Sequence, residues 1–157
     1  MSVKRDIRSL SQDQMVQFFE ANGEKAFRAK QVYQWLWQKS ASSFNEMTNL
    51  SKSTRSLLEE HFYFNLLEVD LMQRSKDGTI KNAVKLHDGA MVESVLIPTE
   101  KRITACVSSQ VGCSLDCTFC ATASLKRMRN LTPDEIYDQV VVIDQQGKEY
   151  FDRPLTN

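Results

Sequence analysis

Three cysteines gathered within eight residues constrain this chain more than any other feature of its sequence. Cys113, Cys117 and Cys120 follow the spacing C-x3-C-x2-C, directly after Val111-Gly112. Soft thiolate ligands this close together are typical of sites for soft metals and iron–sulfur clusters. A structural zinc site takes four protein ligands, whereas three cysteines on a four-iron cluster leave one iron open to a further molecule. The spacing therefore predicts an iron–sulfur cluster.

Two other interpretations of these cysteines stay open. Positions i, i+4 and i+7 lie on one face of a helix, so the three side chains could be buried together there. Alternatively, Cys106 could supply a fourth ligand and the site could bind zinc. Gly112 and Asp116 indicate a loop rather than a regular helix, which favours a segment that wraps a cluster.

Composition and length indicate a globular protein. The chain has 157 residues, of which 41% are hydrophobic and 25% charged, enough for one domain or a small domain plus part of another. No apolar run approaches the roughly 20 residues of a membrane span, and residues 1–8 lack the apolar segment of a signal peptide. We expect a cytoplasmic protein with no membrane association, in a compartment where clustered thiols bind metal more often than they form disulfides.

Charge is unevenly distributed although the net charge is zero. Residues 101–130 hold five Lys or Arg side chains against one Asp, a net charge of +4, and they surround the cysteines. Residues 131–157 carry a net charge of −4. The basic segment would suit a polyanionic substrate or cofactor, and an ordinary solvated charged surface is the alternative.

The first 64 residues show the pattern of a small helical module. Ser11, followed three residues later by Gln14, forms a capping box at the start of a helix. The expected elements are helices near 11–22, 28–39 and 51–62, with a polar loop over 40–49. The module also carries cationic side chains suited to phosphate contacts, or simply to a charged helix surface: Lys25, Arg28, Lys30, Lys39, Lys52 and Arg55.

From residue 66 the pattern changes to short strands. The expected strands are 67–71, 81–87, 91–97 and 102–107, with Asp-Gly turns at 76–78 and 87–89 that predict an antiparallel meander. Thr132, Pro133 and Glu135 then predict the start of a helix, with the apolar stripe Ile136, Val140 and Ile143 and an end near Gly147.

These patterns predict an α+β fold in three parts. Residues 1–64 would form a helical module of the RNA-binding-like kind, and residues 65–100 an antiparallel strand region. Residues 101–157 would be the first unit of a truncated partial α/β barrel of the TIM type, with the cysteines on the loop after a strand.

Glu93 is a further candidate site residue. It lies in an expected strand on the same face as Met91, Val95 and Ile97, an unusual place for a carboxylate. Partial burial would raise its pKa and make it a better proton acceptor. A glutamate on a half-exposed strand is the alternative interpretation.

The sequence around the cysteines resembles the RlmN family of radical S-adenosylmethionine (SAM) enzymes, which methylate carbon 2 of adenine in RNA. The resemblance is carried by Cys106–Thr122, Gly23–Gln31, Phe44–Ser51, Ser75–Thr79, Val92–Pro98 and Arg129–Thr132. It covers residues 8–145 and includes the sister Cfr group, which acts on carbon 8. The spacing C-x3-C-x2-C alone would indicate only the radical SAM superfamily.

The resemblance implies a cofactor set and roles for individual residues. Cys113, Cys117 and Cys120 would bind a [4Fe-4S] cluster whose open iron binds SAM. Phe119 would pack near the SAM adenine, unless it is a core aromatic. Glu93 would be the proton acceptor. Cys106 would be a second functional thiol that forms a transient disulfide with a methyl-carrying cysteine, unless it is a small buried strand residue.

The resemblance also implies partners and a function. The partners would be 23S ribosomal RNA, a subset of transfer RNAs and an electron donor such as flavodoxin, with the enzyme a monomer. Adenine C8 methylation and a non-catalytic, zinc-stabilised RNA-binding module are the alternatives.

The chain departs from the family pattern in two ways. Ala123-Ser124 replace the glycine that usually follows Cys-Ala-Thr, and the Gly-Met-Gly-Glu-Pro segment and the methyl-carrying cysteine do not occur. The chain therefore resembles the N-terminal portion of these enzymes. We expect residues 1–157 alone to be catalytically inert and to leave the apolar face of the last helix uncovered.

Overall fold

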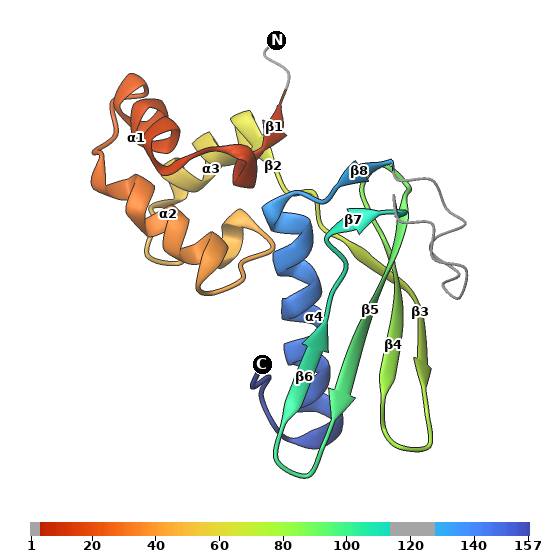
Figure 1. Cartoon of the computed structure of the whole chain (residues 1–157). Coiled ribbons are helices and arrows are strands. Elements are labelled where there is room, and N and C mark those ends of the chain that lie inside the picture. The colour runs from red at the N-terminus through yellow and green to blue at the C-terminus, as the bar shows by residue number, and fades with distance from the viewer. Residues whose placement is uncertain (1–3, 114–127) are drawn as a thin grey trace. The chain divides into compact units, whose positions relative to one another are not determined.

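The computed structural model describes residues 4–113 and 128–157, which divide into two compact units (Figure 1). One unit is Met1–Asn65 and the other is Leu66–Asn157. Helices dominate the first unit, and an antiparallel sheet with one long helix forms the second. This combination confirms the predicted α+β class. No helix among the described residues is long and apolar enough to cross a membrane.

Two of the three α-helices described in the first unit start at the predicted caps. Its elements are β1 (Arg5–Asp6), η1 (Ile7–Ser9), α1 (Gln12–Ala21), α2 (Phe27–Trp37), η2 (Phe44–Glu46), α3 (Lys52–His61) and β2 (Phe62–Tyr63). The Ser11 hydroxyl accepts a bond from Gln14 N, and the Gln14 side chain accepts one from Ser11 N, which confirms the capping box. Ser51 caps α3 in the same way by accepting from Thr54 N.

Two predictions for this unit are wrong. The expected polar loop over 40–49 contains η2, and Phe44 and Met47 enter the hydrophobic core of the unit. Phe62 lies beyond α3, because its backbone turns to an extended conformation after its N–H bonds the Leu58 carbonyl. Phe62 and Tyr63 instead pair in parallel with Arg5 and Asp6, which ties the two ends of the unit together.

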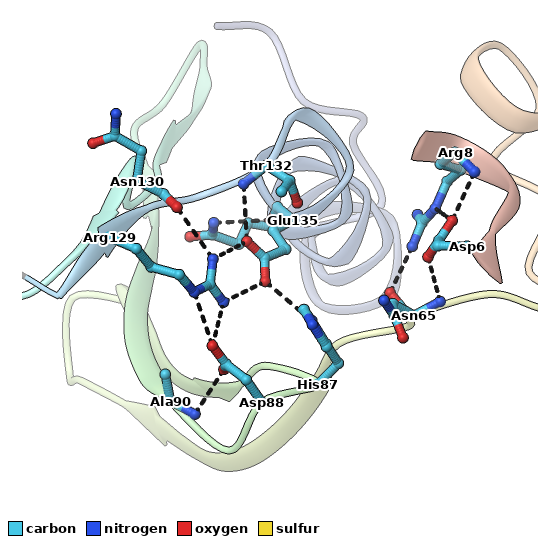
Figure 2. Close-up of polar contacts among 11 residues, drawn as sticks. Asp6, Arg8, Asn65, His87, Asp88, Ala90, Arg129, Asn130, Thr132 and Glu135 are labelled. Atoms are coloured by element: carbon cyan, nitrogen blue, oxygen red, sulfur yellow. Dashed lines mark hydrogen bonds and ion pairs between the residues drawn. The ribbon is translucent and has the colours of Figure 1, made fainter. Parts of the chain in front are cut away.

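A buried polar contact reinforces this closure (Figure 2). The Asp6 carboxylate accepts bonds from Arg8 N and Asn65 N, both at 2.6 Å, and the Arg8 guanidinium donates to the Asn65 carbonyl, also at 2.6 Å. Asp6 and Arg8 are each only 7% exposed. Burying charges is favourable only when they are paired and hydrogen-bonded, so these contacts make the closure specific.

The second unit is built on a four-stranded antiparallel meander with the order β3-β4-β5-β6. Its strands are Glu68–Arg74, Ile80–Lys85, Met91–Pro98 and Ile103–Cys106. Gly78 and Gly89 adopt positive φ values of 89° and 82° in the turns that join the first three strands, as the Asp-Gly signals predicted. Since β6 pairs directly with β5, the proposed boundary at residue 100 runs within this sheet and remains a prediction.

Helix α4 (Pro133–Phe151) packs on one face of the sheet, so the predicted uncovered helix face is wrong. Ile143 is fully buried and packs with Ile80, Leu96 and Ile103. Ile136 and Val140 are only half-buried.

The buried face of α4 is instead partly polar. Gln146 and Asn82 bond through both of their amide groups, at 2.7 and 2.9 Å. Gln139 donates to the Ser108 carbonyl and accepts from Ser108 N. Because their amide groups are hydrogen-bonded in this way, Gln139 and Gln146 can be buried beside Ile143.

Gly147 lies inside α4 and does not end it, contrary to prediction. The helix continues to Phe151 and is capped by Asp152 in the left-handed conformation. Arg153 N then donates back to the Gly147 carbonyl. A Cβ atom at Gly147 would lie 2.8 Å from the Arg153 carbonyl oxygen and 3.4 Å from Ile103 Cγ2. Glycine is needed here because the backbone of Arg153 and the side chain of Ile103 leave no room for a Cβ atom.

Replacing Gly147 by Ala should therefore destabilise the second unit despite the higher helix propensity of alanine. We expect a loss of about 1–3 kcal/mol, typical of overpacking, in the opening free energy of α4 amides measured by hydrogen exchange. Gln145→Ala, at an exposed position of the same helix, is the control and should change little. Equal protection in the two variants would contradict the close packing at Gly147.

Candidate functional site

A short antiparallel pair flanks the segment that contains most of the predicted cluster ligands. Strand β7 (Gln110–Val111) pairs with β8 (Arg129–Asn130), and Met128 N donates to the Val111 carbonyl at 2.9 Å. Cys113 follows β7 and is half-buried. The predicted ligands Cys117 and Cys120, and Phe119 between them, lie outside the described residues. The strand pair thus brings the two ends of this segment side by side.

Arg129 joins this pair to two other elements of the unit (Figure 2). Its guanidinium forms a two-pronged contact with Glu135, at 2.7 and 2.8 Å. It also donates to Asp88 Oδ2 at 2.8 Å. Glu135 additionally accepts from Thr132 N at 2.9 Å, and His87 Nδ1 lies 3.4 Å from its other oxygen. The network fixes β8 to the turn before β5 and to the first turn of α4.

The electrostatics of this network are dominated by the buried carboxylate. Burial alone would raise the pKa of Glu135, but the hydrogen bonds from Arg129 and Thr132 and the charge of Arg129 outweigh it, so the pKa falls below its usual value. The hydrogen bonds to Glu135 raise the pKa of Arg129 further. The backbone N–H of Ala90, followed by Arg129, lowers the pKa of Asp88. All three groups are therefore charged at neutral pH.

Sequence reasoning missed this network. Arg129 is one of the cations of the basic segment 101–130 that would suit a polyanion, yet it forms ion pairs with Asp88 and Glu135. Glu135 was predicted only as a capping residue, which it also is. The available signal in the sequence is a helix-capping glutamate six residues after an arginine. The second partner, Asp88, lies 41 residues from Arg129 in the sequence, and only the fold brings the two together.

Glu93 and Cys106 come together on the face of the sheet opposite α4. Val95 pairs directly with Cys106, and Glu93 lies two residues before Val95. Side chains two residues apart on a strand share a face, so Glu93 and Cys106 are diagonal neighbours, typically about 7–8 Å apart. The Ser108 hydroxyl donates to the Glu93 carbonyl at 2.8 Å and extends the pairing of the two strands.

The expected partial burial of Glu93 is wrong. Its side chain is 60% exposed and forms an ion pair of 2.7 Å with Lys81 Nζ on β4. The alternative of a small buried strand residue fails for Cys106, which is exposed. The apolar side chains expected beside Glu93 are also exposed: Met91 is 45% and Ile97 40% exposed. Among the described residues, this face of the sheet therefore carries exposed side chains at both candidate positions.

Within residues 4–113 and 128–157, no three His, Cys, Asp or Glu side chains gather as a metal site. The described part of the chain thus offers no other ligand set for a metal ion. The Cys113 thiol is the one described member of the predicted set, and as a soft donor it suits an iron–sulfur cluster.

The charged pair of Arg129 and Glu135 should stabilise the second unit in a pH-dependent manner. A carboxylate with a lowered pKa stabilises the fold above its unfolded pKa, about 4.5 for glutamate, and this contribution disappears as the pH falls. Glu135→Gln should therefore lower the opening free energy of α4 amides by about 2 kcal/mol at pH 7, and by progressively less below pH 4.5. Hydrogen exchange measures both values.

Glu149→Gln, at an exposed position of the same helix, is the matched control and should leave protection nearly unchanged. A deficit in Glu135→Gln that is as large at pH 3.5 as at pH 7 would mean that lost packing, rather than the charged pair, causes the effect.

Comparison with known proteins places these features in a family context. Residues 5–64 match the model of the ribosomal RNA large subunit methyltransferase N-terminal domain. A probable dual-specificity RNA methyltransferase RlmN of Christiangramia forsetii is 68% identical over 98% of this chain and 44% of the relative. The dual-specificity RNA methyltransferase RlmN of Desulfotalea psychrophila is 47% identical over 87% of this chain and 38% of the relative.

A solved structure gives the same result for the fold. The crystal structure of a radical SAM methyltransferase from Sphaerobacter thermophilus matches 98% of this chain and 45% of its own, with a TM-score of 0.81 and 34% identity. The chain thus spans less than half the length of the relatives that it matches. Over nearly its whole length, it resembles the N-terminal portion of the RlmN methyltransferases.

Proposed function

We propose that this chain is part of a radical SAM methyltransferase that methylates carbon 2 of adenine in 23S ribosomal RNA and in a subset of transfer RNAs. The observation that carries the proposal is 68% identity, over 98% of the chain, to a probable dual-specificity RNA methyltransferase. The C-x3-C-x2-C spacing supports it independently. Since the chain covers 44% of that relative, the activity belongs to the full-length protein.

Cys113, Cys117 and Cys120 would bind the [4Fe-4S] cluster, and Phe119 would pack near the adenine of SAM. When bound and reduced, the cluster supplies the electron that cleaves SAM and yields a 5′-deoxyadenosyl radical. The β7–β8 pair and its Arg129 contacts would anchor the segment that carries these ligands to the sheet and to α4. In the full-length protein, residues 101–157 would form the first unit of a partial α/β barrel.

Glu93 and Cys106 would serve the transfer of the methyl group. Replacing a ring hydrogen by a methyl group requires a proton to leave the base, and Glu93 would accept it. Cys106 would form a disulfide with the methyl-carrying cysteine, and that bond would replace the bond between the cysteine sulfur and the transferred carbon. A reductant would then restore both thiols. The shared open face of β5 and β6 supports this division of roles.

The remaining partners follow from this chemistry. Cluster reduction needs a low-potential electron donor such as flavodoxin, and the RNA substrates place the enzyme in the cytoplasm. We propose that the enzyme acts as a monomer.

The cluster assignment predicts the metal content of the full-length protein. Anaerobic reconstitution should give about four irons and four sulfides per chain, with broad absorption near ~400 nm. Cys113→Ala should abolish this species. Cys106→Ala is the matched control because it removes an exposed thiol outside the predicted ligand set, and it should retain the iron.

Stoichiometric zinc without iron would contradict the proposal and favour the zinc-stabilised RNA-binding module. Loss of iron in Cys106→Ala would make Cys106 a ligand rather than a functional thiol.

The role of Glu93 predicts a separation between metal binding and turnover. Glu93→Gln in the full-length enzyme should keep its iron but slow methyl transfer about 100-fold or more, as expected for loss of a general base. Methylated adenosine in single-turnover reactions, measured by mass spectrometry, gives the rate. Glu68→Gln, at an exposed position of the same sheet, should react normally. A normal rate in Glu93→Gln would remove Glu93 from the catalytic set.

A further inference from the structure

The outward face of helix α2 carries aromatic side chains where an amphipathic helix usually has polar ones. The inward face buries Ala29, Val32 and Leu36 in the core of the first unit. Among the side chains that remain exposed, Phe27 is 50% exposed and Tyr33, at the edge of the buried stripe, is 37% exposed. Large exposed aromatic side chains at helical spacing indicate a surface that contacts another molecule.

The surroundings of this face are cationic. Residues 25–39 contain Lys25, Arg28, Lys30 and Lys39 and no Asp or Glu. The nearest carboxylate in sequence, Glu24, accepts a bond from the Thr54 hydroxyl at 2.7 Å and lies 3.9 Å from Arg28 Nε. Lys30 is exposed. This excess of positive charge favours a polyanionic partner over a neutral or basic one.

The aromatic and cationic groups are arranged in alternation along the helix. The Arg28 guanidinium lies 4.9 Å from the centroid of the Phe27 ring. The ring of Tyr33 lies 6.2 Å from that of Trp37, which is half-buried and packs against the core of the unit. Lys30 falls between these two groups because residues three or four apart occupy one side of a helix. The face thus offers flat surfaces for bases and a cation for a phosphate.

We infer that this α2 face, formed by Phe27, Lys30 and Tyr33, binds unpaired nucleotides of RNA by stacking their bases on its two exposed rings. Bases in a duplex already stack on each other, whereas unpaired bases can stack on aromatic side chains. The inference builds on the proposed RNA methyltransferase function. It goes beyond that function by assigning single-stranded RNA to a surface distinct from Glu93 and Cys106.

The test compares an unstructured RNA of about 12 nucleotides, within the usual range of such sites, with a duplex of the same strand. Binding of the full-length protein is measured by fluorescence anisotropy over a range of salt concentrations. Phe27→Leu and Tyr33→Leu keep apolar bulk at exposed positions and should each weaken single-strand binding about five- to tenfold. Lys30→Gln should reduce the slope of log K against log salt by about 0.7.

Matched controls come from the same unit. Tyr63→Leu removes an aromatic side chain that is 42% exposed on β2, and Lys4→Gln removes an exposed cation just before β1. Both should bind single strands like the wild type, and circular dichroism verifies that every variant is folded. The salt slopes of Phe27→Leu and Tyr33→Leu should stay at the wild-type value because no charge is removed.

Three outcomes would overturn the inference. Wild-type affinity for single strands in both ring variants would show that the rings do not stack on bases, and equal weakening for the duplex would show recognition of the backbone alone. Self-association of the wild type that Tyr33→Leu abolishes would assign the face to a second copy of the chain. If the wild type binds neither RNA, the proposed function itself is wrong.

Discussion

The contact between Arg129 and Glu135 supports the arrangement of the whole second unit. The guanidinium of Arg129, which lies on β8, contacts the buried carboxylate of Glu135 at the start of α4. It also contacts the partly exposed carboxylate of Asp88 at the turn before β5. A buried charge without a partner costs several kcal/mol, so the two ions specify each other's position. Because β8 begins at Arg129, the same contact fixes the described residues that follow the cysteine-containing segment in sequence.

The two faces of the four-stranded sheet differ in what covers them. The face toward α4 is held by apolar packing around Ile143 and by amide pairs such as Gln146 with Asn82. These pairs are directional, so they fix the register of the helix on the sheet more specifically than an apolar stripe would. The other face stays open and carries Glu93, Lys81 and Cys106. The helix thus supports one side of the sheet, and the residues proposed for methyl transfer lie on the other.

Local signals in the sequence predicted the elements of the fold well. The caps at Ser11, Ser51 and Thr132 and the glycine turns of the meander depend on residues within four positions of each other, and the structure confirms them. The wrong predictions concern residues whose surroundings depend on segments that are distant in the sequence. Gly147 looks like a helix end until Arg153 folds back on it. The exposure of Glu93 depends on which sheet face α4 covers, and alternation alone does not choose between the two faces.

The candidate site was predicted in parts rather than as an arrangement. Cysteine spacing predicts cluster ligands, and resemblance to a family predicts roles for Glu93 and Cys106; both stay predictions. Their placement on one face follows from the register of β5 and β6, which sequence alone left open. The links from Arg129 to Asp88 and Glu135 join three separate elements, so no local pattern could predict them.

We propose that the full-length protein methylates carbon 2 of adenine in RNA. The most direct test of this proposal is the content of modified adenosines in 23S ribosomal RNA and transfer RNA from cells that lack the gene, measured by mass spectrometry of nucleosides. We expect 2-methyladenosine to disappear in these cells, and we expect the wild-type gene to restore it while a Cys113→Ala gene does not. Undiminished 2-methyladenosine, or loss of 8-methyladenosine in its place, would contradict the proposed activity.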